Sequence, residues 1–559
     1  MTNTMPWLQS YPSNVSAEIN ADEFDSILAL LEQSCAKYAN YTAFINMGKK
    51  LSYNELDTHA TAFAAYLQQT LKMKKGDRIA LMMPNLLQYP IALFGALKAG
   101  LVVVNVNPLY TARELQHQLH DSGATAIVAV TNFGNTLQKV INDTKVQHVI
   151  LTNIGDQLAP HKRTVVNFVV KHIKKMVPNY HLPNAISMRR VLTEGKQLNY
   201  QRPQLRAEDS AFLQYTGGTT GTAKGAVLSH RNIVANVLQV FAHFGPRTLK
   251  EKERAVTPLP LYHIFANTVS MMLFMYMGGC NMLITNPRDL DAFAKDLKGY
   301  PFTMMFGLNT LFVGLLKHEG FRHADFSHCR FTIAGGMATQ KSVADEWQAV
   351  TNMPVIEGYG LTECSPVVAG GLNTQQAFVD NIGVPLPSTQ MRIVDEKGNP
   401  VATGETGEIQ IRGPQVMQGY WKNELETREC LSPDGWLSSG DIGSMDEKGY
   451  FTIRDRKKDM ILVSGFNVYP SEIEAVALLH PSILEAAAIG IHDEVAGERV
   501  ALFVVGLEDL TQEEIRQHCR QHLTGYKVPK AVTFCDSLPK SNVGKVLRRE
   551  LKAQYAPDS

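Results

Sequence analysis

Residues 215–226 read Tyr-Thr-Gly-Gly-Thr-Thr-Gly-Thr-Ala-Lys-Gly-Ala, so glycines and hydroxyl side chains surround a single lysine. Glycine lacks a Cβ atom, and a backbone rich in it can turn sharply and bring N–H groups close to phosphate oxygens. The threonine hydroxyls add hydrogen-bond donors, and Lys224 adds a positive charge. This stretch predicts a loop that binds a polyphosphate.

Two common phosphate-binding motifs do not fit this loop. Ala223 precedes Lys224 and Gly225 follows it, so the order is not Gly-x-x-x-x-Gly-Lys-Ser/Thr. The spacing also differs from Gly-x-Gly-x-x-Gly, which is typical of dinucleotide-binding enzymes. The loop therefore argues against both a Walker-type NTPase and a dinucleotide-dependent dehydrogenase.

Short β-prone runs alternate with helix-length stretches on both sides of the loop. Before it, the β-prone runs lie at 80–83, 102–106, 126–130 and 148–151, and helical patterns lie at 86–99 and 112–121. After it, β-prone runs lie at 255–257, 282–285, 303–306, 331–334 and 355–357. This alternation is typical of βα units, and we expect two large α/β layers with mostly parallel sheets.

The pattern changes after residue 383. Alternating runs at 391–394, 408–411 and 450–453, with turns rich in Gly, Pro, Asp and Asn, predict an antiparallel β module. The last hundred or so residues mix helical and extended patterns, which predicts a small α+β domain. The expected fold is therefore α/β, with a large N-terminal region of two α/β subdomains plus the β module (1–453), a charged hinge linker (454–459) and a mobile C-terminal domain (460–559).

Composition narrows the class of protein. The 559 residues suggest about three or four structural modules, and 45% hydrophobic with 19% charged residues is ordinary for large buried cores. A net charge of +1 gives no general attraction to nucleic acid, and we expect none as a partner. The seven cysteines are scattered without a Cys-x-x-Cys pair, which favours a reducing compartment.

We expect a cytoplasmic location, because residues 1–27 show no secretory signal. The segment 255–287 is strongly apolar in part, but prolines, glycines and asparagines interrupt it. Its apolar part is too short to cross a bilayer, so it predicts a buried helix.

Three further sites carry charged residues suited to a nucleotide. Glu363 follows the run 355–357 closely, where open α/β sheets place ligand-binding residues, and its carboxylate suits Mg²⁺. Asp441 can accept hydrogen bonds from a ribose diol, and Arg456 can donate to ribose or phosphate. Lys545 follows a turn-rich stretch and could neutralise a carboxylate and a phosphate pushed together. Taken singly, each is better explained as a turn residue or a surface charge.

Together and in this order, these motifs resemble the adenylate-forming (AMP-binding) superfamily, and in particular the bacterial long-chain fatty acid CoA ligases. The resemblance covers essentially the whole chain and is most specific at 215–226, 258–265, 358–363, 434–441 and 454–474. It implies two steps: a fatty acid carboxylate attacks the α-phosphorus of ATP to give an acyl adenylate and pyrophosphate, and the CoA thiol then displaces AMP.

The resemblance also implies roles for individual residues. The catalytic set would be Lys545, Glu363, Thr216 and Lys224, with Mg²⁺ at Thr216 and Glu363. The phosphate loop would comprise Tyr215, Thr216, Gly217, Gly218, Thr219, Thr220, Gly221, Thr222, Ala223, Lys224, Gly225 and Ala226. The rest of ATP would contact Gly335, Gly336, Glu357, Gly358, Tyr359, Thr362, Asp441 and Arg456. The C-terminal domain would turn about Lys458 and bring Gly465 to the pantetheine of CoA, and a homodimer is expected.

Leu462, His263 and Cys364 lie within or beside these motifs. Many relatives carry a lysine four residues beyond the hinge, where this chain has Leu462, so a nucleotide or CoA contact from that position is in doubt. His263 is explained either as a satisfied core histidine or, by resemblance, as a wall between nucleotide and acyl sites. Cys364 adjoins Glu363 but is not expected to act as a nucleophile, because the reaction uses the thiol of CoA.

A basic segment lies between Asp156 and Glu194, and no acidic residue occurs within it. On a helix over 162–177, one face would carry Val166, Val169, Val170, Ile173 and Val177, and another Lys171, Lys174 and Lys175. Two interpretations stay open: a helix lying on anionic lipid, which would make the protein peripheral on a membrane, and a helix packed on the protein's own core.

Alternative functions remain at this stage. Within the superfamily, the chain could be a ligase for medium-chain or aromatic acids, or one that transfers its product to a carrier protein. From another class, it could be a membrane-associated lipid sensor without catalysis, although Glu363, Lys224 and Lys545 are all present. Acyl chain length cannot be inferred from the sequence; the segments 271–277 and 304–316 are the candidates for the acyl pocket.

Overall fold

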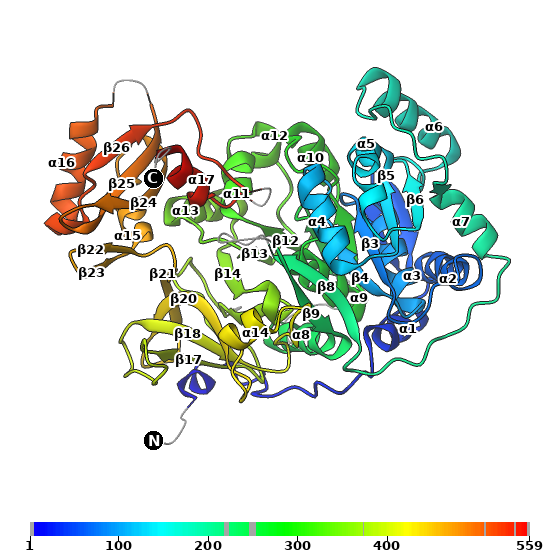
Figure 1. The fold of residues 1–559 in the computed structure, drawn as a ribbon, viewed down its shortest axis with the longest axis horizontal. Helices are drawn as coiled ribbons and strands as arrows, with labels where there is room; N and C mark the ends of the chain where they lie inside the picture. The colour runs from blue at the N-terminus through cyan, green and yellow to red at the C-terminus, as the bar shows by residue number, and fades with distance from the viewer. Residues whose placement is uncertain are drawn as a thin grey trace.

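The computed structural model describes residues 5–216, 223–244, 253–372, 374–507, 510–541 and 544–555. Its first large sheet has eight strands in the order β19-β9-β8-β4-β3-β5-β6-β7, and the strands from β8 to β7 run parallel (Figure 1). The strands are β3 (Arg78–Met82), β4 (Val102–Asn105), β5 (Ala126–Val130), β6 (His148–Thr152), β7 (Ile186–Ser187), β8 (Ser210–Thr216), β9 (Lys224–Ser229) and β19 (Gly419–Tyr420). Continuous burial along β3 to β6 is what a parallel sheet covered on both faces requires.

The second large sheet has nine strands in the order β16-β15-β14-β13-β12-β10-β11-β1-β2. They are β1 (Thr42–Asn46), β2 (Lys49–Ser52), β10 (Arg254–Thr257), β11 (Cys280–Leu283), β12 (Met304–Gly307), β13 (Phe331–Gly335), β14 (Val355–Gly360), β15 (Val367–Gly370) and β16 (Val384–Pro385). The sequence predicts the central parallel strands. It does not predict β1, which pairs with β11 from more than two hundred residues away.

Helices cover both sheets and share a continuous core. On the N-terminal side these are α1 (Ile27–Lys37), α2 (Tyr53–Gln69), α3 (Gln88–Lys98), α4 (Ala112–Ser122), α5 (Gly134–Gln138), α6 (Pro160–Phe168), α7 (Met188–Gly195) and α8 (His230–Phe244). The second sheet adds α9 (Leu273–Met277), α10 (Leu290–Leu297), α11 (Asn309–Leu316), α12 (Glu319–Arg322) and α13 (Lys341–Thr351). Every residue of α3 is buried, and buried side chains of α1, α2, α3 and α8 join those of both sheets in one cluster.

The apolar segment 255–287 forms the buried helix that the sequence predicts. A π-helical turn, η7 (Ala266–Met272), continues into α9, and Tyr276 is the only residue of the two that is not buried. Gly278 ends α9 in the left-handed conformation that favours glycine. In the described part of the chain, no helix is long and apolar enough to cross a bilayer.

The predicted β module is a four-stranded antiparallel sheet in the order β17-β18-β20-β21. Its strands are β17 (Gln390–Val394), β18 (Gly407–Arg412), β20 (Leu437–Met445) and β21 (Phe451–Arg456), and α14 (Glu424–Cys430) lies between β19 and β20 in the chain. In Figure 1 this module, in yellow, lies below the small C-terminal part.

The C-terminal part has a sheet and a hydrophobic core of its own. Its strands are β22 (Ile461–Val463), β23 (Phe466–Val468), β24 (Ile483–Asp493), β25 (Gly497–Gly506) and β26 (Ala531–Phe534), and its helices are α15 (Pro470–Ala477), α16 (Gln512–His522) and α17 (Arg548–Tyr555). Two α/β layers, a β module and a small α+β unit together confirm the expected fold class (Figure 1).

Candidate active site

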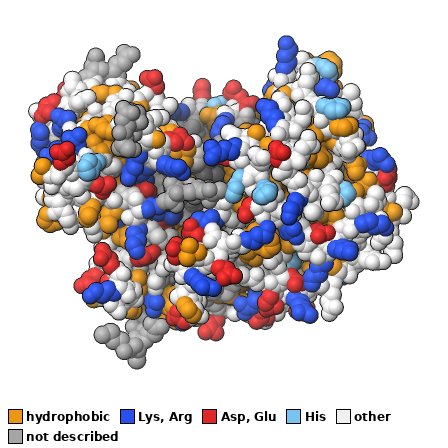
Figure 2. Space-filling view, viewed as in Figure 1, with side chains coloured by type: hydrophobic (Ala, Val, Ile, Leu, Met, Phe, Trp, Pro, Cys, Tyr) orange, Lys and Arg blue, Asp and Glu red, His pale blue; other side chains and the backbone are white. Residues whose placement is uncertain are grey.

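A cavity of about 1020 Å³ lies at the junction between the C-terminal part and the rest of the molecule. The carboxyl ends of β8, β13 and β14 reach it, bringing Thr216, Gly335 and Gly360 to one place. Parallel strands of open α/β sheets present ligand-binding residues at these ends. Figure 2 shows Lys and Arg side chains gathered around this junction, which suits an anionic ligand.

The flanks of the predicted phosphate loop form an antiparallel pair, although residues 217–222 lie outside the described part of the chain. β8 pairs with β9 so that Tyr215 faces Gly225 and Thr216 faces Lys224. The Tyr215 hydroxyl donates to Asp121 Oδ2 at 2.5 Å, which ties the entry of the loop to α4. Thr216 and Lys224 line the cavity, while Ala223, Gly225 and Ala226 lie beside it in the same hairpin.

Lys224 has two partners that the sequence did not indicate. Its ammonium forms an ion pair with Glu426 of α14 and lies 5.0 Å from the centre of the Tyr420 ring. Tyr420 reaches this position because β19 pairs with β9, with Tyr420 opposite Ala226. Both Tyr420 and Glu426 come close to Lys224 because of this pairing between distant segments. No local pattern in the sequence indicates such a pairing.

Glu363 lies on a short 3-10 turn, Thr362–Cys364, directly beyond β14. Its Oε1 atom accepts a hydrogen bond from the Tyr420 hydroxyl at 2.6 Å. Glu363, Thr362 and Thr216 line the same cavity. Tyr420 thus supports both Glu363 and Lys224.

The oxygen atoms of Thr216 and Glu363 fit a hard cation such as Mg²⁺, which prefers oxygen ligands and keeps several waters. Within the described residues, no group of three or more His, Cys, Asp or Glu could hold a metal by itself. A single carboxylate with a hydroxyl suits a cation whose remaining ligands are phosphates and waters.

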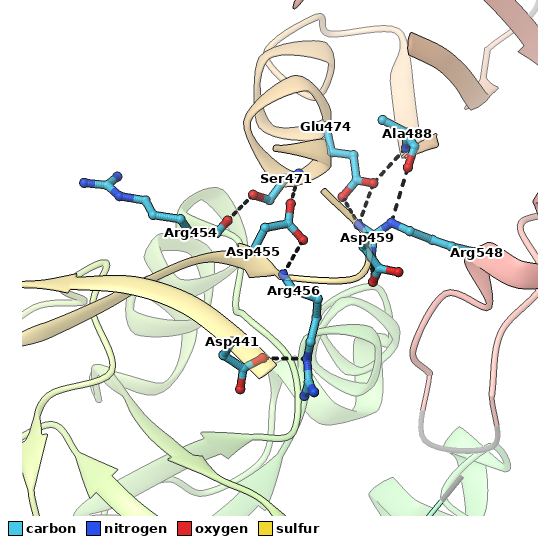
Figure 3. Close-up of polar contacts among 9 residues, drawn as sticks. All are labelled: Asp441, Arg454, Asp455, Arg456, Asp459, Ser471, Glu474, Ala488 and Arg548. Atoms are coloured by element: carbon cyan, nitrogen blue, oxygen red, sulfur yellow. Dashed lines mark hydrogen bonds and ion pairs between the residues drawn. The ribbon is translucent and has the colours of Figure 1, made fainter. Parts of the chain in front are cut away.

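Asp441 lies behind the cavity wall and is only 2% exposed. Its Oδ1 atom pairs with Arg456 Nε at 2.6 Å (Figure 3), and Oδ2 accepts the Tyr359 hydroxyl at 2.5 Å. Burial raises the pKa of Tyr359 well above its usual value, so it remains a donor. Both Tyr359 and Arg456 line the cavity, whereas the carboxylate that orients them does not.

The predicted adenine-binding residues come together at the ends of β13 and β14. Gly335, Gly336, Gly358 and Tyr359 line the cavity. Gly336 has a φ of 89°, and a Cβ there would meet no atom within 4 Å, so this glycine is required for its backbone conformation. Glu357 is turned toward Thr339, whose N–H donates to it at 2.6 Å, and burial raises the pKa of Glu357 to about 7.

Lys545 enters the cavity from a tight turn of the C-terminal part. Ser541 N donates to Lys545 O at 2.7 Å, and Gly544 has a φ of 77°. A Cβ on Gly544 would lie 2.6 Å from Thr310 Oγ1, so this turn approaches α11 closely. The structure therefore brings Lys545 to the cavity that also holds Thr216 and Glu363.

The charge of Lys545 lies in an unusual environment. Burial, together with the nearby cations Arg456 and Lys458, lowers the pKa of its ammonium to about 8. The carboxylates of Asp441 and Asp459 oppose this effect. The pKa of Lys458 is lowered for the same reasons, chiefly burial and Arg456.

Gly465 is the predicted site residue that lies apart from the others. It occupies the turn between β22 and β23 with a φ of 83°, and it does not line the cavity. Leu462, the position at which a lysine was expected by resemblance, is half exposed on β22. The cavity that holds Lys545 and the turn that holds Gly465 are thus separate in this orientation.

The surroundings of His263 and Cys364 decide how each can act. His263 lines the cavity, and burial lowers its pKa to about 4, which leaves the imidazole neutral. Cys364 is fully buried, and burial raises the pKa of its thiol well above the usual value. A thiol with a raised pKa is a poor nucleophile, as expected.

A small, entirely apolar cavity adjoins the large one. Both are lined by Val240 and Phe244 of α8 and by Ile333 of β13. The small cavity also reaches Met277 and Met304, one in each of the two segments suspected from the sequence. An apolar ligand group could extend from the polar cavity in this direction.

The basic segment forms α6 and a following π-helical turn, η4 (Val169–Ile173), neither of which has a buried residue. Lys174 N donates to Val169 O, five residues back, and this extra residue rotates the side chains that follow. Four of the five residues of the predicted apolar face are partly covered (Val166, Val169, Val170 and Val177), whereas Ile173 is more than half exposed. Val165, Phe168 and Met176, which are not part of that face, are also more than half exposed. Figures 1 and 2 show this helix projecting from the molecule, with hydrophobic and basic side chains together.

Comparisons with known proteins agree with this geometry. The family model described as AMP-binding enzyme matches residues 31–421, and the model of its C-terminal domain matches residues 472–545. The chain is 56% identical over 547 residues to a long-chain-fatty-acid–CoA ligase of Yersinia pestis, covering 98% of this chain and 97% of that protein. It is 52% identical over 553 residues to the ligase of the same name in Haemophilus influenzae, covering 98% of both.

The fold is also found among solved structures. The anthranilate CoA ligase AuaEII, solved with anthranoyl-AMP, superimposes with a TM-score of 0.83 at 21% identity and covers 96% of this chain and 99% of its own. At this identity the similarity concerns the fold alone.

The first prediction concerns the buried carboxylate of Asp441. We expect Asp441→Asn to lower the free energy of unfolding by about 2 kcal/mol, because it removes the buried charged partner of Arg456, whose own side chain is about one-third exposed. Urea denaturation of the two proteins measures the change. Glu424→Gln breaks the exposed Glu424–Arg428 pair and should change stability by less than about 0.5 kcal/mol; equal effects of the two substitutions would contradict the prediction.

Proposed function

The chain belongs to the AMP-binding enzyme family, and from this membership we propose that it is an acid–thiol ligase that joins a long-chain fatty acid to CoA with the consumption of ATP. The observation that supports the proposal most strongly is the meeting of Lys545, Thr216 and Glu363 at one cavity, although they come from distant parts of the chain. Identity above 50% with fatty acid CoA ligases along nearly the whole chain favours this acid over medium-chain or aromatic acids, and CoA over a carrier protein.

In the first step, the fatty acid carboxylate attacks the α-phosphorus of ATP. Lys545 lies between these two anions and offsets their repulsion, while Thr362 binds the α-phosphate. Thr216, Lys224 and the loop between them bind the β- and γ-phosphates. Donors held in a site that excludes water act more strongly than they do in solvent.

The remainder of ATP is held by the wall opposite Lys545. Adenine lies against Gly335, Gly336, Gly358 and Tyr359, and Arg456 donates to the ribose or phosphate. Asp441 contributes to the ribose site, chiefly by fixing Arg456 and Tyr359. Thr216 and Glu363 would hold Mg²⁺, which neutralises phosphate charge when it is bound.

The acyl chain extends into the apolar region next to the phosphate site. Support for this direction comes from the adjoining apolar cavity lined by α8, α9, β12 and β13; its volume is only about 10 Å³, so the side chains around it would have to move apart to admit the chain. Neutral His263 forms part of the boundary between this region and the nucleotide.

The second step needs a different arrangement, because Lys545 occupies the place through which the CoA thiol would approach the adenylate. We propose that residues 460–559 turn as a unit about Lys458 in the linker 454–459, relative to 1–453. Lys545 then leaves, and Gly465 reaches the pantetheine. The separate position of Gly465 in the present orientation is consistent with this exchange.

A catalytically inactive lipid sensor is the alternative from another class, and the preserved geometry of Lys224, Glu363 and Lys545 does not favour it. A homodimer is retained as an expectation for the family.

The second prediction separates the two steps. Lys545→Ala should reduce acid-dependent pyrophosphate release by at least about 100-fold, because charge neutralisation between the two anions is lost. Thiolysis of supplied acyl adenylate by CoA should change by less than about twofold, since Lys545 has left the site. Wild-type protein that forms no AMP from ATP, CoA and palmitate would overturn the proposed function.

The third prediction concerns pH. The Lys545 ammonium with a pKa near 8 is protonated below that pH and neutral above it, so kcat/KM for ATP in the first step should decline as pH rises through about 8. Lys545→Arg should be slower but lack this decline, because arginine keeps its charge. A wild-type profile that stays flat up to pH 10 would contradict the assignment.

The exposed apolar and basic residues of the segment 160–177 favour a second property, binding to an anionic membrane surface. Val165, Phe168, Ile173 and Met176 are apolar and exposed, and Lys171, Lys174 and Lys175 stand near them. An amphipathic helix with this combination lies in the interface of anionic lipid. A substrate dissolved in membrane would give such contact a purpose.

The fourth prediction tests this contact. Lys171→Glu, Lys174→Glu and Lys175→Glu together should weaken binding to phosphatidylserine vesicles by at least about 100-fold, since each lysine near the surface contributes about 1 kcal/mol. Vesicle sedimentation measures the binding. The control carries Lys298→Glu, Lys317→Glu and Lys397→Glu, which are exposed elsewhere, and should bind as wild type does. Undiminished binding of the first variant would remove the proposal.

A further inference from the structure

Helix α15 follows the strands β22 and β23, and its N-terminal cap comes from Asp455, on the other side of Lys458 in the chain. The N-cap residue Tyr469 provides no side-chain hydrogen bond. Instead, Asp455 Oδ2 on β21 accepts the N–H of Ser471 at 2.8 Å, and the Ser471 hydroxyl donates to the Arg454 carbonyl (Figure 3). A carboxylate at this position satisfies a free helix N–H and interacts favourably with the helix dipole.

Asp455 itself is fixed to the N-terminal side. Its other oxygen accepts the Arg456 N–H at 2.7 Å, and the side chain is only 7% exposed. Arg456 is paired with Asp441, and Lys457 donates from its backbone to Gly440 and from its side chain to Glu408. The chain up to Lys457 is thus bonded to the β module, so the capping carboxylate belongs to that body.

The middle of α15 is bonded to the segment that carries Lys545. Glu474, one turn after Ser471, binds Arg548 Nη2 through both oxygens at 2.7 and 2.8 Å (Figure 3). Arg548 also donates to Ala488 O at 3.3 Å and lies 3.5 Å from Asp459. Because Arg548 follows Lys545 by three residues, α15 forms a rigid connection between Asp455 and the lysine loop.

We propose that Asp455 is a positioning residue for the first step: by capping α15 from across the linker, it holds the C-terminal part in the orientation that places Lys545 in the cavity. The inference rests on the two orientations of the proposed function. A turn about Lys458 separates Ser471 from Asp455, which lie on opposite sides of it. The Glu474–Arg548 pair lies on the C-terminal side and moves with Lys545, so the contacts of Ser471 with Asp455 and with the Arg454 carbonyl are among those that break.

The test compares the two half-reactions in Asp455→Ala. Loss of a helix cap corresponds to about a fivefold shift in an equilibrium, or about 1 kcal/mol. We therefore expect acid-dependent pyrophosphate release to fall about fivefold and thiolysis of supplied acyl adenylate to stay the same or rise. Asp455→Asn keeps one acceptor oxygen and should recover part of the loss.

A matched control is Asp289→Ala, which removes the cap of α10 far from the linker. Asp289→Ala should leave the ratio of the two half-reaction rates unchanged, because a general loss of stability affects both half-reactions alike. If Asp455→Ala slows both half-reactions equally, or slows neither, the proposal is overturned.

A readout that needs no activity distinguishes this proposal from the function itself. Arg454, Arg456, Lys457 and Lys458 are all potential trypsin sites within the linker. Cleavage there should be about fivefold faster in Asp455→Ala than in wild type or Asp289→Ala, because the linker is released more often. Unchanged cleavage would refute the positioning role even if wild-type protein makes acyl-CoA; faster cleavage in a protein without ligase activity would refute only the function.

Discussion

Burial of the Lys545 ammonium beside two other cations is the constraint on which the arrangement of this molecule depends. Burial and the nearby cations Arg456 and Lys458 lower its pKa to about 8, although Asp441 and Asp459 oppose them. A cation in such a place lacks enough negative charge around it. In the proposed first step, a triphosphate and a carboxylate would provide that charge. The same shortage would favour the proposed withdrawal of Lys545 once pyrophosphate has gone.

Because this lysine comes from the C-terminal part, its position is decided by a few contacts near the linker rather than by the cores of the two bodies. Gly544 approaches Thr310, and Asp455 caps α15, while the hydrophobic clusters of the two parts remain separate. Contacts of this kind contribute about a kilocalorie each, which suits the change of orientation proposed for the two steps. In that proposal, the cores keep their shape while the balance between orientations shifts.

The sequence predicts most of the fold because its strands and helices are marked locally. The runs at 126–130 and 331–334 become β5 and β13, and the buried helix within 255–287 is found. Pairing between distant segments is not marked in this way: β1 joins β11, and β19 places Tyr420 beside Lys224 and Glu363. On the basic helix, Ile173 is exposed although it belongs to the predicted apolar face; a π-helical turn shifts the register there, and no periodicity of the sequence reveals such a turn.

The partners that the sequence missed also explain how the phosphate site can open to a ligand. Glu426, which neutralises Lys224, is about two-fifths exposed, and an ion pair of this kind contributes little to stability. If Lys224 binds phosphate as proposed, the phosphate would replace Glu426 at small cost, and Lys224 would exchange one anion for another. Tyr420 stays in place during that exchange, since its backbone is paired with β9 and its hydroxyl with Glu363. The carboxylate suited to the metal is thus held in position before any ligand arrives, whereas the cation beside it is held loosely enough to move.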